Sequence, residues 1–353
     1  MKSALRKVVA TSAALSAVLA VTAGCVESGR EDAGASGAAC PFAVDESVTS
    51  TVRLGFQAIP NGDLLVKDRN LLQACLPNAT ITWSQFASGA DVVQAFGAGS
   101  LDIGTLGSSP ATKALSAPLN LPVQVVWIHD VIGTSESLVV KDSSVTELTG
   151  LRGKRVATPF GSTAHYSLLA ALDKAGLTDQ VELINLQPEA IPGAWQGNQI
   201  DAAWVWDPTL SKLTAAGGTV LTSSAETAAD GAPTYDVALA DRKFLADNAA
   251  FAIAWAKVQD YAVAQINDQQ AEAAVSIGAQ LGIAPDQVIP QLAGYEYLPA
   301  AEQAGSRYLG GGFGADLEGT ARFLLSQGGI AAVGSEQQYR DGIAVAPAAG
   351  ASS

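Results

Sequence analysis

The sequence predicts an α/β fold built from parallel sheets. Short apolar runs alternate with helical stretches from Thr51 to Asp241, and this alternation is typical of strands joined by helical connections. After Asp241 the pattern becomes mostly helical. The chain has 353 residues and 48% of them are hydrophobic, which is enough to bury a large core and indicates two domains.

Each expected strand is a short apolar run, and each expected helix fills the interval before the next run. The expected strands are Val52–Phe56, Thr80–Trp83, Ile103–Leu106, Val123–Ile128, Leu138–Lys141, Arg155–Thr158, Val181–Asn185, Ala202–Trp206 and Val237–Ala240. The helices expected between them are Gly89–Ala98, Pro110–Ser116, Ala164–Ala175, Glu189–Gly197 and Thr209–Ala216. The C-terminal helices are expected at Ala249–Asn267, Gln269–Leu281, Pro285–Leu292 and Ala315–Gln327.

Residues 1–24 have the pattern of a secretory signal peptide. A basic start is followed by an apolar run from Val8 to Val21 and by small residues before Cys25. A cut directly before a cysteine resembles the bacterial lipobox, in which that cysteine is diacylated, so we expect lipidation at Cys25. The alternatives are a transmembrane anchor, for which the apolar run is too short, and an ordinary signal peptide, which does not need the cysteine.

The charge balance limits the partners of the exported chain. Removing residues 1–24 leaves 17 Lys and Arg (20 minus three) against 34 Asp and Glu, a net charge of −17. Binding to nucleic acid or to anionic lipid needs basic patches, so we expect neither. The covalent acyl chains would then be the membrane tether, and they would hold the protein at the outer face of the cytoplasmic membrane.

The remaining cysteines favour one disulfide and no metal site. Once Cys25 carries lipid, Cys40 and Cys75 form an even pair in an oxidising compartment, so we expect them to be joined; two unrelated thiols are the alternative. His129 and His165 stand far apart, and no Cys/His cluster has the spacing of metal ligands. We expect no metal and no cofactor.

Two helix starts are candidates for binding an anion. Gly107-Ser108-Ser109-Pro110 follows a strand and opens a helix, and the free amides at such a helix start attract negative charge. Ser162 or Thr163 caps a second helix after the strand that ends at Thr158. A plain helix cap is the alternative for the first of these helix starts. Catalysis by Ser162 or Thr163 with His165 is disfavoured, because no Gly-x-Ser-x-Gly motif is present.

Acidic and aromatic side chains provide candidates for binding a cation. Glu136 and Asp236 each lie just before an apolar strand, and those strands are candidates for two crossings between lobes. Trp206 ends another strand beside Asp207, at the strand end where open α/β sheets bind ligands. Surface acids and core packing are the alternative readings.

These motifs together resemble the taurine-binding proteins within the sulfonate, nitrate and taurine-binding family of ABC importers. The resemblance extends from about Val52 to Gln327. The stretches that carry it are Leu106–Pro110 (LGSSP), Ser135-Glu136, Leu151–Ala157 (LRGKRVA), Ser162-Thr163, His165–Leu172 (HYSLLAAL), Asn185–Pro188 (NLQP), Ala194–Gln196 (AWQ), Val205-Trp206 and Asp236-Val237.

The resemblance implies a two-lobed periplasmic-binding-protein fold of type II with two hinge crossings. Lobe I would combine residues 50–138 with 240–340, and lobe II would be residues 139–239. Residues 25–49 would be a lipid-anchored flexible tether, and 341–353 a disordered tail. The protein is expected to be a monomer that passes its ligand to the permease subunits.

The resemblance also implies a binding site for a short zwitterion, taurine or a related aminosulfonate. The sulfonate end would contact Gln57, Ser108, Ser109, Ser162, Thr163 and His165. The amine end would contact Glu136 and Asp236, with Trp206 as a wall, because a buried charge needs a partner. Alternative ligands are aliphatic sulfonates and nitrate. A desulfinase-like enzyme on the same fold is disfavoured, because every cysteine lies at or before position 75.

Overall fold

A computed structural model describes residues 39–352, which lie in one compact unit. The predicted signal peptide, Cys25 and the first part of the predicted tether lie outside the described residues. Within residues 39–352 no helix is both long and apolar enough to cross a membrane.

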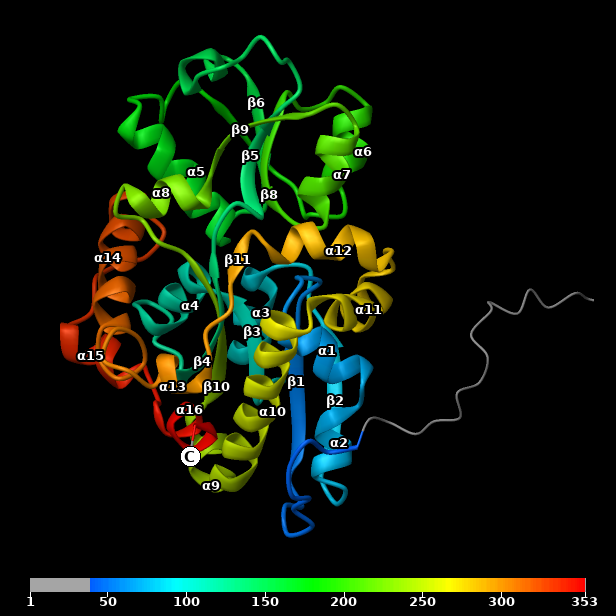
Figure 1. Cartoon of the computed structure of the whole chain (residues 1–353). Helices are drawn as coiled ribbons and strands as arrows, with labels where there is room; N and C mark the ends of the chain where they lie inside the picture. The colour runs from blue at the N-terminus through cyan, green and yellow to red at the C-terminus, as the bar shows by residue number, and fades with distance from the viewer. Residues whose placement is uncertain (1–38, 353) are drawn as a thin grey trace, which may run out of the picture. The chain divides into compact units, whose positions relative to one another are not determined.

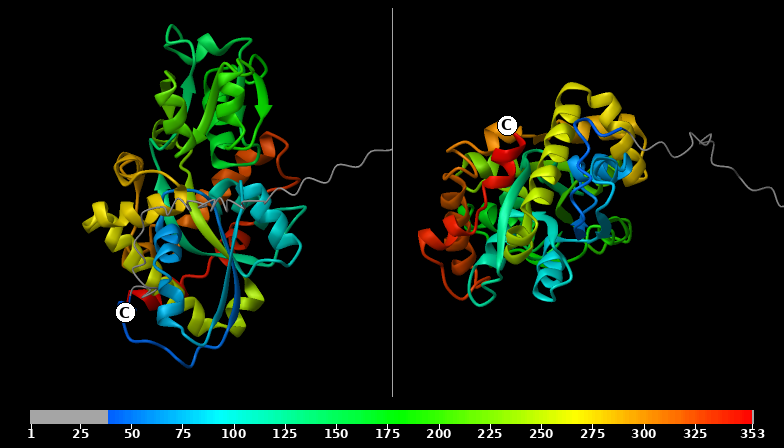
Figure 2. Two further views of the ribbon diagram at one scale, coloured as in Figure 1. Left: turned by 90° about the vertical axis from the view of Figure 1, so that its right-hand side faces the viewer. Right: turned by 90° about the horizontal axis from the view of Figure 1, so that it is seen from below.

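The chain forms two separate sheets, each with helices packed around it (Figures 1 and 2). The first sheet has the order β11-β4-β10-β3-β1-β2 and the second has the order β7-β6-β8-β5-β9. We call residues 39–132 with 235–352 lobe I, and residues 136–229 lobe II. The strands of lobe I are β1 Thr51–Phe56, β2 Thr80–Gln85, β3 Ile103–Gly107, β4 Val123–Ile132, β10 Tyr235–Asp241 and β11 Tyr295–Glu296. Those of lobe II are β5 Glu136–Val140, β6 Arg155–Thr158, β7 Glu182–Asn185, β8 Ala202–Trp206 and β9 Thr219–Ser223.

Helices follow most of the strands, as the alternating pattern predicts. Lobe I contains α1 Gly62–Asp68, α2 Leu71–Cys75, α3 Gly89–Gly97, α4 Ser108–Leu115, α9 Arg242–Asp247, α10 Ala249–Asp268, α11 Gln270–Leu281, α12 Pro285–Leu292, α13 Ala300–Gln303, α14 Phe313–Ser326, α15 Glu336–Asp341 and α16 Ala346–Ala351. Lobe II contains a 3-10 turn at Leu148–Leu151 and the helices α5 Thr163–Lys174, α6 Ile191–Gln196, α7 Thr209–Ala215 and α8 Ser224–Ala229.

The prediction of parallel sheets is confirmed for β1 with β2 and β3 and for β6 with β7 and β8, but it is wrong for the remaining pairs. Strand β10 pairs antiparallel with both β3 and β4, and β5 pairs antiparallel with both β8 and β9. These are the strands that follow the two crossings, because the chain enters lobe II at β5 and re-enters lobe I at β10. A strand that enters a sheet from the other lobe runs opposite to strands that reach the sheet through a helix of their own lobe. The boundaries also move: Glu136 already belongs to the lobe II sheet, and all of β10 belongs to lobe I.

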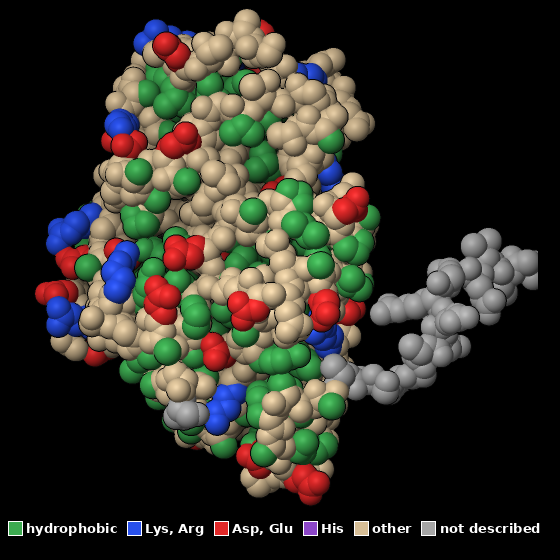
Figure 3. Space-filling view, viewed as in Figure 1, with side chains coloured by type: hydrophobic (Ala, Val, Ile, Leu, Met, Phe, Trp, Pro, Cys, Tyr) green, Lys and Arg blue, Asp and Glu red, His purple; other side chains and the backbone are tan. Residues whose placement is uncertain are grey.

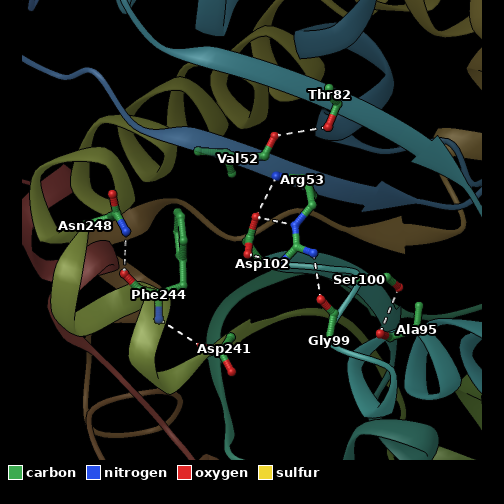
Figure 4. Close-up of polar contacts among 10 residues, drawn as sticks. All are labelled: Val52, Arg53, Thr82, Ala95, Gly99, Ser100, Asp102, Asp241, Phe244 and Asn248. Carbon is green, nitrogen blue, oxygen red and sulfur yellow. Dashed lines mark hydrogen bonds and ion pairs between the residues drawn. The ribbon is translucent and has the colours of Figure 1, made fainter.

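The same arginine–aspartate contact holds the sheet in both lobes. In lobe I, Arg53 of β1 donates through Nε and Nη2 to the carboxyl of Asp102, which also accepts from the Arg53 backbone amide (Figure 4). In lobe II, Arg155 of β6 makes the same three contacts with Asp201. Each aspartate directly precedes the strand that pairs with the arginine's strand. The carboxyl therefore fixes the start of two neighbouring strands, and with it the point where each strand ends at the pocket described below.

The ends of the described chain are attached to lobe I. The predicted disulfide between Cys40 and Cys75 is present in the structure, with sulfur atoms 2.00 Å apart. The predicted disordered tail is wrong for most of its length: α16 packs on α10, Ala348 is fully buried and the Ala344 amide donates to the Val125 carbonyl. Because Ala and Gly are small, this segment approaches α10 closely. The same composition, considered without the structure, predicts disorder.

Charged side chains are spread over the face of the molecule shown in Figure 3. On the face shown in Figure 3, acidic side chains (red) and basic ones (blue) are interspersed and neither kind forms a continuous patch. This face therefore offers no basic surface of the kind that nucleic acid requires.

Candidate functional site

A pocket between the two lobes collects most of the polar residues that the sequence singles out. It is lined from lobe I by Gln57, Ile59, Gly89, Gly107, Pro110, Ile132, Asp236 and Tyr295, and from lobe II by Glu136, Ser162, Thr163 and Trp206. We call this set the interlobe pocket. Its lining, taken over the described residues, contains two carboxyl groups and no Lys or Arg. A positively charged group is therefore the complementary occupant near Glu136 and Asp236.

Glu136 is the first residue of β5 and is held by two hydroxyl groups. Thr163 Oγ1 donates to Glu136 Oε2 at 2.6 Å, and Ser224 Oγ donates to Glu136 Oε1 at 2.6 Å. The side chain is 1% exposed, and burial raises the pKa of Glu136 to about 7 although the hydroxyl contacts act to lower it. The carboxyl is thus fixed in position and close to balanced between its charged and neutral forms at neutral pH.

Asp236 approaches the pocket from the opposite lobe. It is the second residue of β10 and is buried. Burial, together with the charge of Glu136, raises the pKa of Asp236 to about 7. Directly opposite Asp236 in the antiparallel ladder lies Asp130 of β4, a fully buried acid that sequence reasoning did not select.

Tyr295 completes the acidic end of the pocket. It belongs to the short strand β11, which pairs with β4, and its hydroxyl has no hydrogen-bond partner in the described part of the chain. Burial raises the pKa of Tyr295 well above its usual value, and the nearby carboxyls of Asp130, Asp207 and Asp236 raise it further. The Tyr295 hydroxyl is therefore a neutral donor and acceptor available to an occupant.

The starts of α4 and α5 form another part of the pocket, next to Glu136. Ser162 caps α5: its Oγ accepts from the His165 amide and donates to the Pro159 carbonyl. The amides at the first positions of α5 have no acceptor within the helix, and the helix dipole places partial positive charge there. Because α5 has 12 residues and α4 has eight, both helix starts favour a negatively charged group.

The two helix starts touch across the pocket. A Cβ built on Gly107, the N-cap of α4, would lie 2.4 Å from Cγ2 of Thr163. Gln57 lines the pocket beside them, and its Nε2 donates to the Thr105 carbonyl at 3.0 Å. The contact leaves the second amide hydrogen of Gln57 free to donate.

Six of the nine ligand-binding residues expected from the sequence line this pocket. They are Gln57, Glu136, Ser162, Thr163, Trp206 and Asp236. Ser108 is buried beside the pocket, where its Oγ accepts from the Tyr235 amide at 3.2 Å. Asp207 is also beside the pocket; its Oδ1 accepts from the amide and hydroxyl of Ser211, and burial raises its pKa.

Ser109 and His165 line a second, largely apolar cavity of about 530 Å³ between α3, α4, α5 and α14. The His165 ring stacks on Phe160 with centroids 4.5 Å apart, and its Nδ1 accepts from the Gly161 amide. Burial, assisted by the nearby Lys113 charge, lowers the pKa of His165 to about 4, so the ring is neutral at pH 7. The structure therefore does not bring Ser109 and His165 together with Glu136 and Asp236.

Sequence reasoning missed Tyr295, Asp130 and Ser224. Tyr295 lies in a strand of two residues, which is too short to show any periodicity. Asp130 lies inside a long apolar strand, where an acid is the one signal that contradicts ordinary core packing. Among residues 39–352, no three His, Cys, Asp or Glu side chains are arranged to hold a metal ion.

Comparison with known proteins identifies the family. A family model described as the substrate-binding domain of an ABC-type glycine betaine transport system matches residues 51–284. The chain is 38% identical to the taurine-binding periplasmic protein of Escherichia coli over 275 residues, which cover 74% of this chain and 82% of that protein. The chain belongs to the family of substrate-binding proteins of ABC importers. This substrate-binding protein therefore acts outside the cytoplasm as one component of an importer.

Other relatives of this substrate-binding protein share its fold. It is 32% identical to a putative aliphatic sulfonates-binding protein of Escherichia coli over 49% of this chain and 54% of that protein. The alkanesulfonate-binding protein SsuA from Xanthomonas axonopodis pv. citri, solved with bound MOPS, matches with a TM-score of 0.67 at 22% identity, covering 86% of this chain and 99% of SsuA. A cysteine-to-serine mutant of DszB in complex with biphenyl-2-sulfinic acid matches with a TM-score of 0.59 at 15% identity, covering 83% of this chain and 96% of DszB. At these identities the solved structures show the two-lobed fold alone.

Proposed function

We propose that this protein captures taurine, or a closely related aminosulfonate, in the interlobe pocket and delivers it to its permease. The observation that carries the proposal is the presence of Glu136 and Asp236 in one buried lining, without a Lys or Arg among the described lining residues. A ligand that enters such a pocket must bring the missing positive charge.

The acidic end matches a primary ammonium group. An ammonium has three N–H donors, and the pocket offers carboxyl oxygens of Glu136 and Asp236 and the hydroxyl oxygen of Tyr295. A quaternary ammonium such as that of glycine betaine has no N–H to donate and is usually held by aromatic rings. The two carboxyls therefore favour a primary amine over glycine betaine.

The helix starts in the pocket lining match a sulfonate. The helix start at Thr163 and the amide of Gln57 provide donors without carrying a full positive charge. An anion without an amine, such as ethanesulfonate or nitrate, would satisfy these donors but would leave the two acids facing a further negative charge. The similarity to the taurine-binding periplasmic protein of Escherichia coli supports this assignment.

Calorimetry with four ligands tests the proposal. Taurine should bind clearly more tightly than ethanesulfonate, nitrate or glycine betaine. Glu136→Gln and Asp236→Asn should each weaken taurine binding at least about 30-fold, because a buried ion pair loses one partner. The exposed acids Glu182 and Asp173, changed in the same way, are matched controls that should leave the affinity unchanged. Equal affinity for taurine and ethanesulfonate would contradict the proposal that Glu136 and Asp236 bind the amine of the ligand.

We further propose that Cys25 is diacylated and that the protein is an anchored monomer. The support is the signal-peptide pattern that ends directly before Cys25. Cys25→Ala should release the protein from the membrane fraction, and the intact mass of the native protein should include two acyl chains. A native protein of unmodified mass would contradict the anchor.

We propose a binding role rather than catalysis of desulfination. Such chemistry needs a cysteine thiolate, and Cys40 and Cys75 are joined to each other. Incubation of the purified protein with taurine and with an aryl sulfinate should release no sulfite; release of sulfite at catalytic turnover would refute this part of the proposal.

A further inference from the structure

Asp130 is a buried acid that has no role in a binding site formed by Glu136 and Asp236 alone. It does not line the interlobe pocket, yet it lies directly opposite Asp236 on the neighbouring strand. Opposite residues of an antiparallel pair have side chains on the same face and close together. Asp130 is 0% exposed, and among the described residues neither of its carboxyl oxygens has a side-chain hydroxyl or amino donor; the backbone donor that acts on it is the amide of Asp236.

The ionisable side chains that interact electrostatically with Asp130 are acids and phenols. Strand β10 contributes Asp236, β5 contributes Glu136, and the segment of β11 contributes Tyr295 and Tyr297. Asp207, after β8, acts on the same two tyrosines.

The nearest basic side chain along the strand is turned away. His129 Nε2 lies 2.8 Å from Thr105 Oγ1, and its ring packs edge-on against Trp255, on the opposite face of β4. In this part of the structure Asp130 has no basic partner, and its polar neighbours are the carboxyl and the backbone amide of Asp236.

The single positive charge of the ligand limits how many of the three buried acids can be ionised at the same time. Three ionised acids, Asp130, Glu136 and Asp236, around one ligand ammonium would leave two uncompensated buried charges, which is costly. Two carboxyl groups that share a site do not both ionise readily, and the more deeply buried member keeps the proton. Asp130 is fully buried, whereas Asp236 reaches the pocket.

We propose that Asp130 is a positioning residue that stays protonated with and without ligand and donates a hydrogen bond to Asp236, so that the Asp236 carboxylate is held in a fixed position for the ligand amine. The proposal rests on the proposed function only in taking an amine as the ligand. Asp236 accepts from Asp130 at one oxygen and keeps the other for the ligand.

The arrangement also predicts which protons move when the ligand binds. Burial holds the pKa of Asp130 well above its usual value, while those of Asp236 and Glu136 are raised to about 7. Near pH 7 the two pocket acids are partly protonated before binding. The arriving ammonium favours their carboxylate forms, so protons pass from Asp236 and Glu136 to solvent, while Asp130 keeps its own.

Two substitutions at Asp130 and calorimetry in buffers of different ionisation enthalpy test the role. Asp130→Asn retains a neutral donor toward Asp236, so taurine affinity should stay within about threefold and the number of protons released should be unchanged. Asp130→Ala removes the donor, and affinity should fall about tenfold. Asp236→Asn should cost at least about 30-fold. An Asp130→Asn variant as impaired as Asp236→Asn would show that Asp130 acts as a charge, which overturns the proposal.

Measurements on the ligand-free protein separate this inference from the choice of ligand. At about pH 9, where Glu136 and Asp236 are ionised, the infrared spectrum of the ligand-free wild type should still contain a buried protonated-carboxyl band that Asp130→Asn removes and the surface control Asp173→Asn keeps. If taurine does not bind the wild type, the proposed function fails while this band still decides the state of Asp130. If Asp130→Asn does not fold, isotope labelling of the aspartate carboxyls in the wild type decides it. Absence of the band overturns the proposal.

Discussion

Gly107 of lobe I and Thr163 of lobe II meet across the interlobe pocket with no room for one more carbon atom. A Cβ on Gly107 would lie 2.4 Å from Thr163 Cγ2, well inside van der Waals contact. The backbone of Gly107 has φ −70 and ψ 159, values that any residue adopts. The glycine is therefore required for the approach of the two lobes and not for the local turn.

The first prediction is that Gly107→Ala lowers affinity without unfolding lobe I. The added methyl group should hold the two helix starts apart, so that a ligand cannot contact both, and taurine affinity should fall at least about tenfold. The unfolding temperature of the ligand-free protein should change little, while its increase on adding taurine should shrink.

Gly193→Ala is the matched control for this substitution. A Cβ at Gly193, inside α6, would have no atom within 4 Å, and alanine favours a helix by about 0.5–1 kcal/mol over glycine. It should leave affinity unchanged. Full affinity in Gly107→Ala as well would show that the contact with Thr163 is not needed for binding.

The second prediction concerns pH. A carboxylate at Glu136 is needed to hold the ammonium, and its pKa is raised to about 7. Affinity for taurine should therefore increase as the pH rises from about 6 to about 8, because the protonated form does not bind the amine. Calorimetry across this range measures the trend. An affinity that is flat, or that decreases over this range, would contradict it.

Thr163→Val tests the same carboxyl through its hydroxyl partner. Valine keeps the shape of threonine but cannot donate to Glu136 Oε2, so the pKa of Glu136 should rise further. The affinity loss should be about tenfold at pH 7 and should become smaller above about pH 8, where the carboxyl ionises again. Thr163→Ser, which keeps the donor, should follow the wild-type profile.

Much of this site was within reach of the sequence, because strand ends place side chains in predictable positions. Glu136, Trp206 and Asp236 each lie at or next to a strand end, and short apolar runs located those ends to within a few residues. The helix starts at Ser108 and Ser162 followed from Ser, Gly and Pro patterns.

The remaining features depend on pairings between distant segments. Asp130 is of interest because it lies opposite Asp236, and Ser224 because it donates to Glu136. No local sequence pattern predicts either partner. The direction of β5 and β10 likewise depends on the chain crossing between lobes, whereas periodicity indicates only that a strand exists. Ser109 and His165 show the converse: both stand in motifs of the family, yet their side chains line the apolar cavity beside the pocket.

The third prediction follows from that placement. His165→Ala should change taurine affinity less than about threefold, because the ring contacts Phe160 and the Gly161 amide and does not line the interlobe pocket. Glu136→Gln in the same assay is the comparison that should lose binding. A loss of tenfold or more in His165→Ala would restore the expectation that this imidazole contacts the sulfonate.

The fourth prediction is that the disulfide stabilises lobe I without tuning the pocket. Cys40 and Cys75 are 35 residues apart, and closing a loop of that length stabilises a fold by about 3–4 kcal/mol through the unfolded chain. Cys75 is fully buried at the end of α2, and neither cysteine lines the interlobe pocket. Changing both cysteines to serine should therefore lower the free energy of unfolding in denaturant by about that amount and leave taurine affinity unchanged. Adding a reductant should destabilise the wild type and have no effect on the double variant, since only the wild type has a bond to break. A double variant that unfolds like the oxidised wild type would show that packing of Val48 and the preceding segment already holds the N-terminal arm on lobe I.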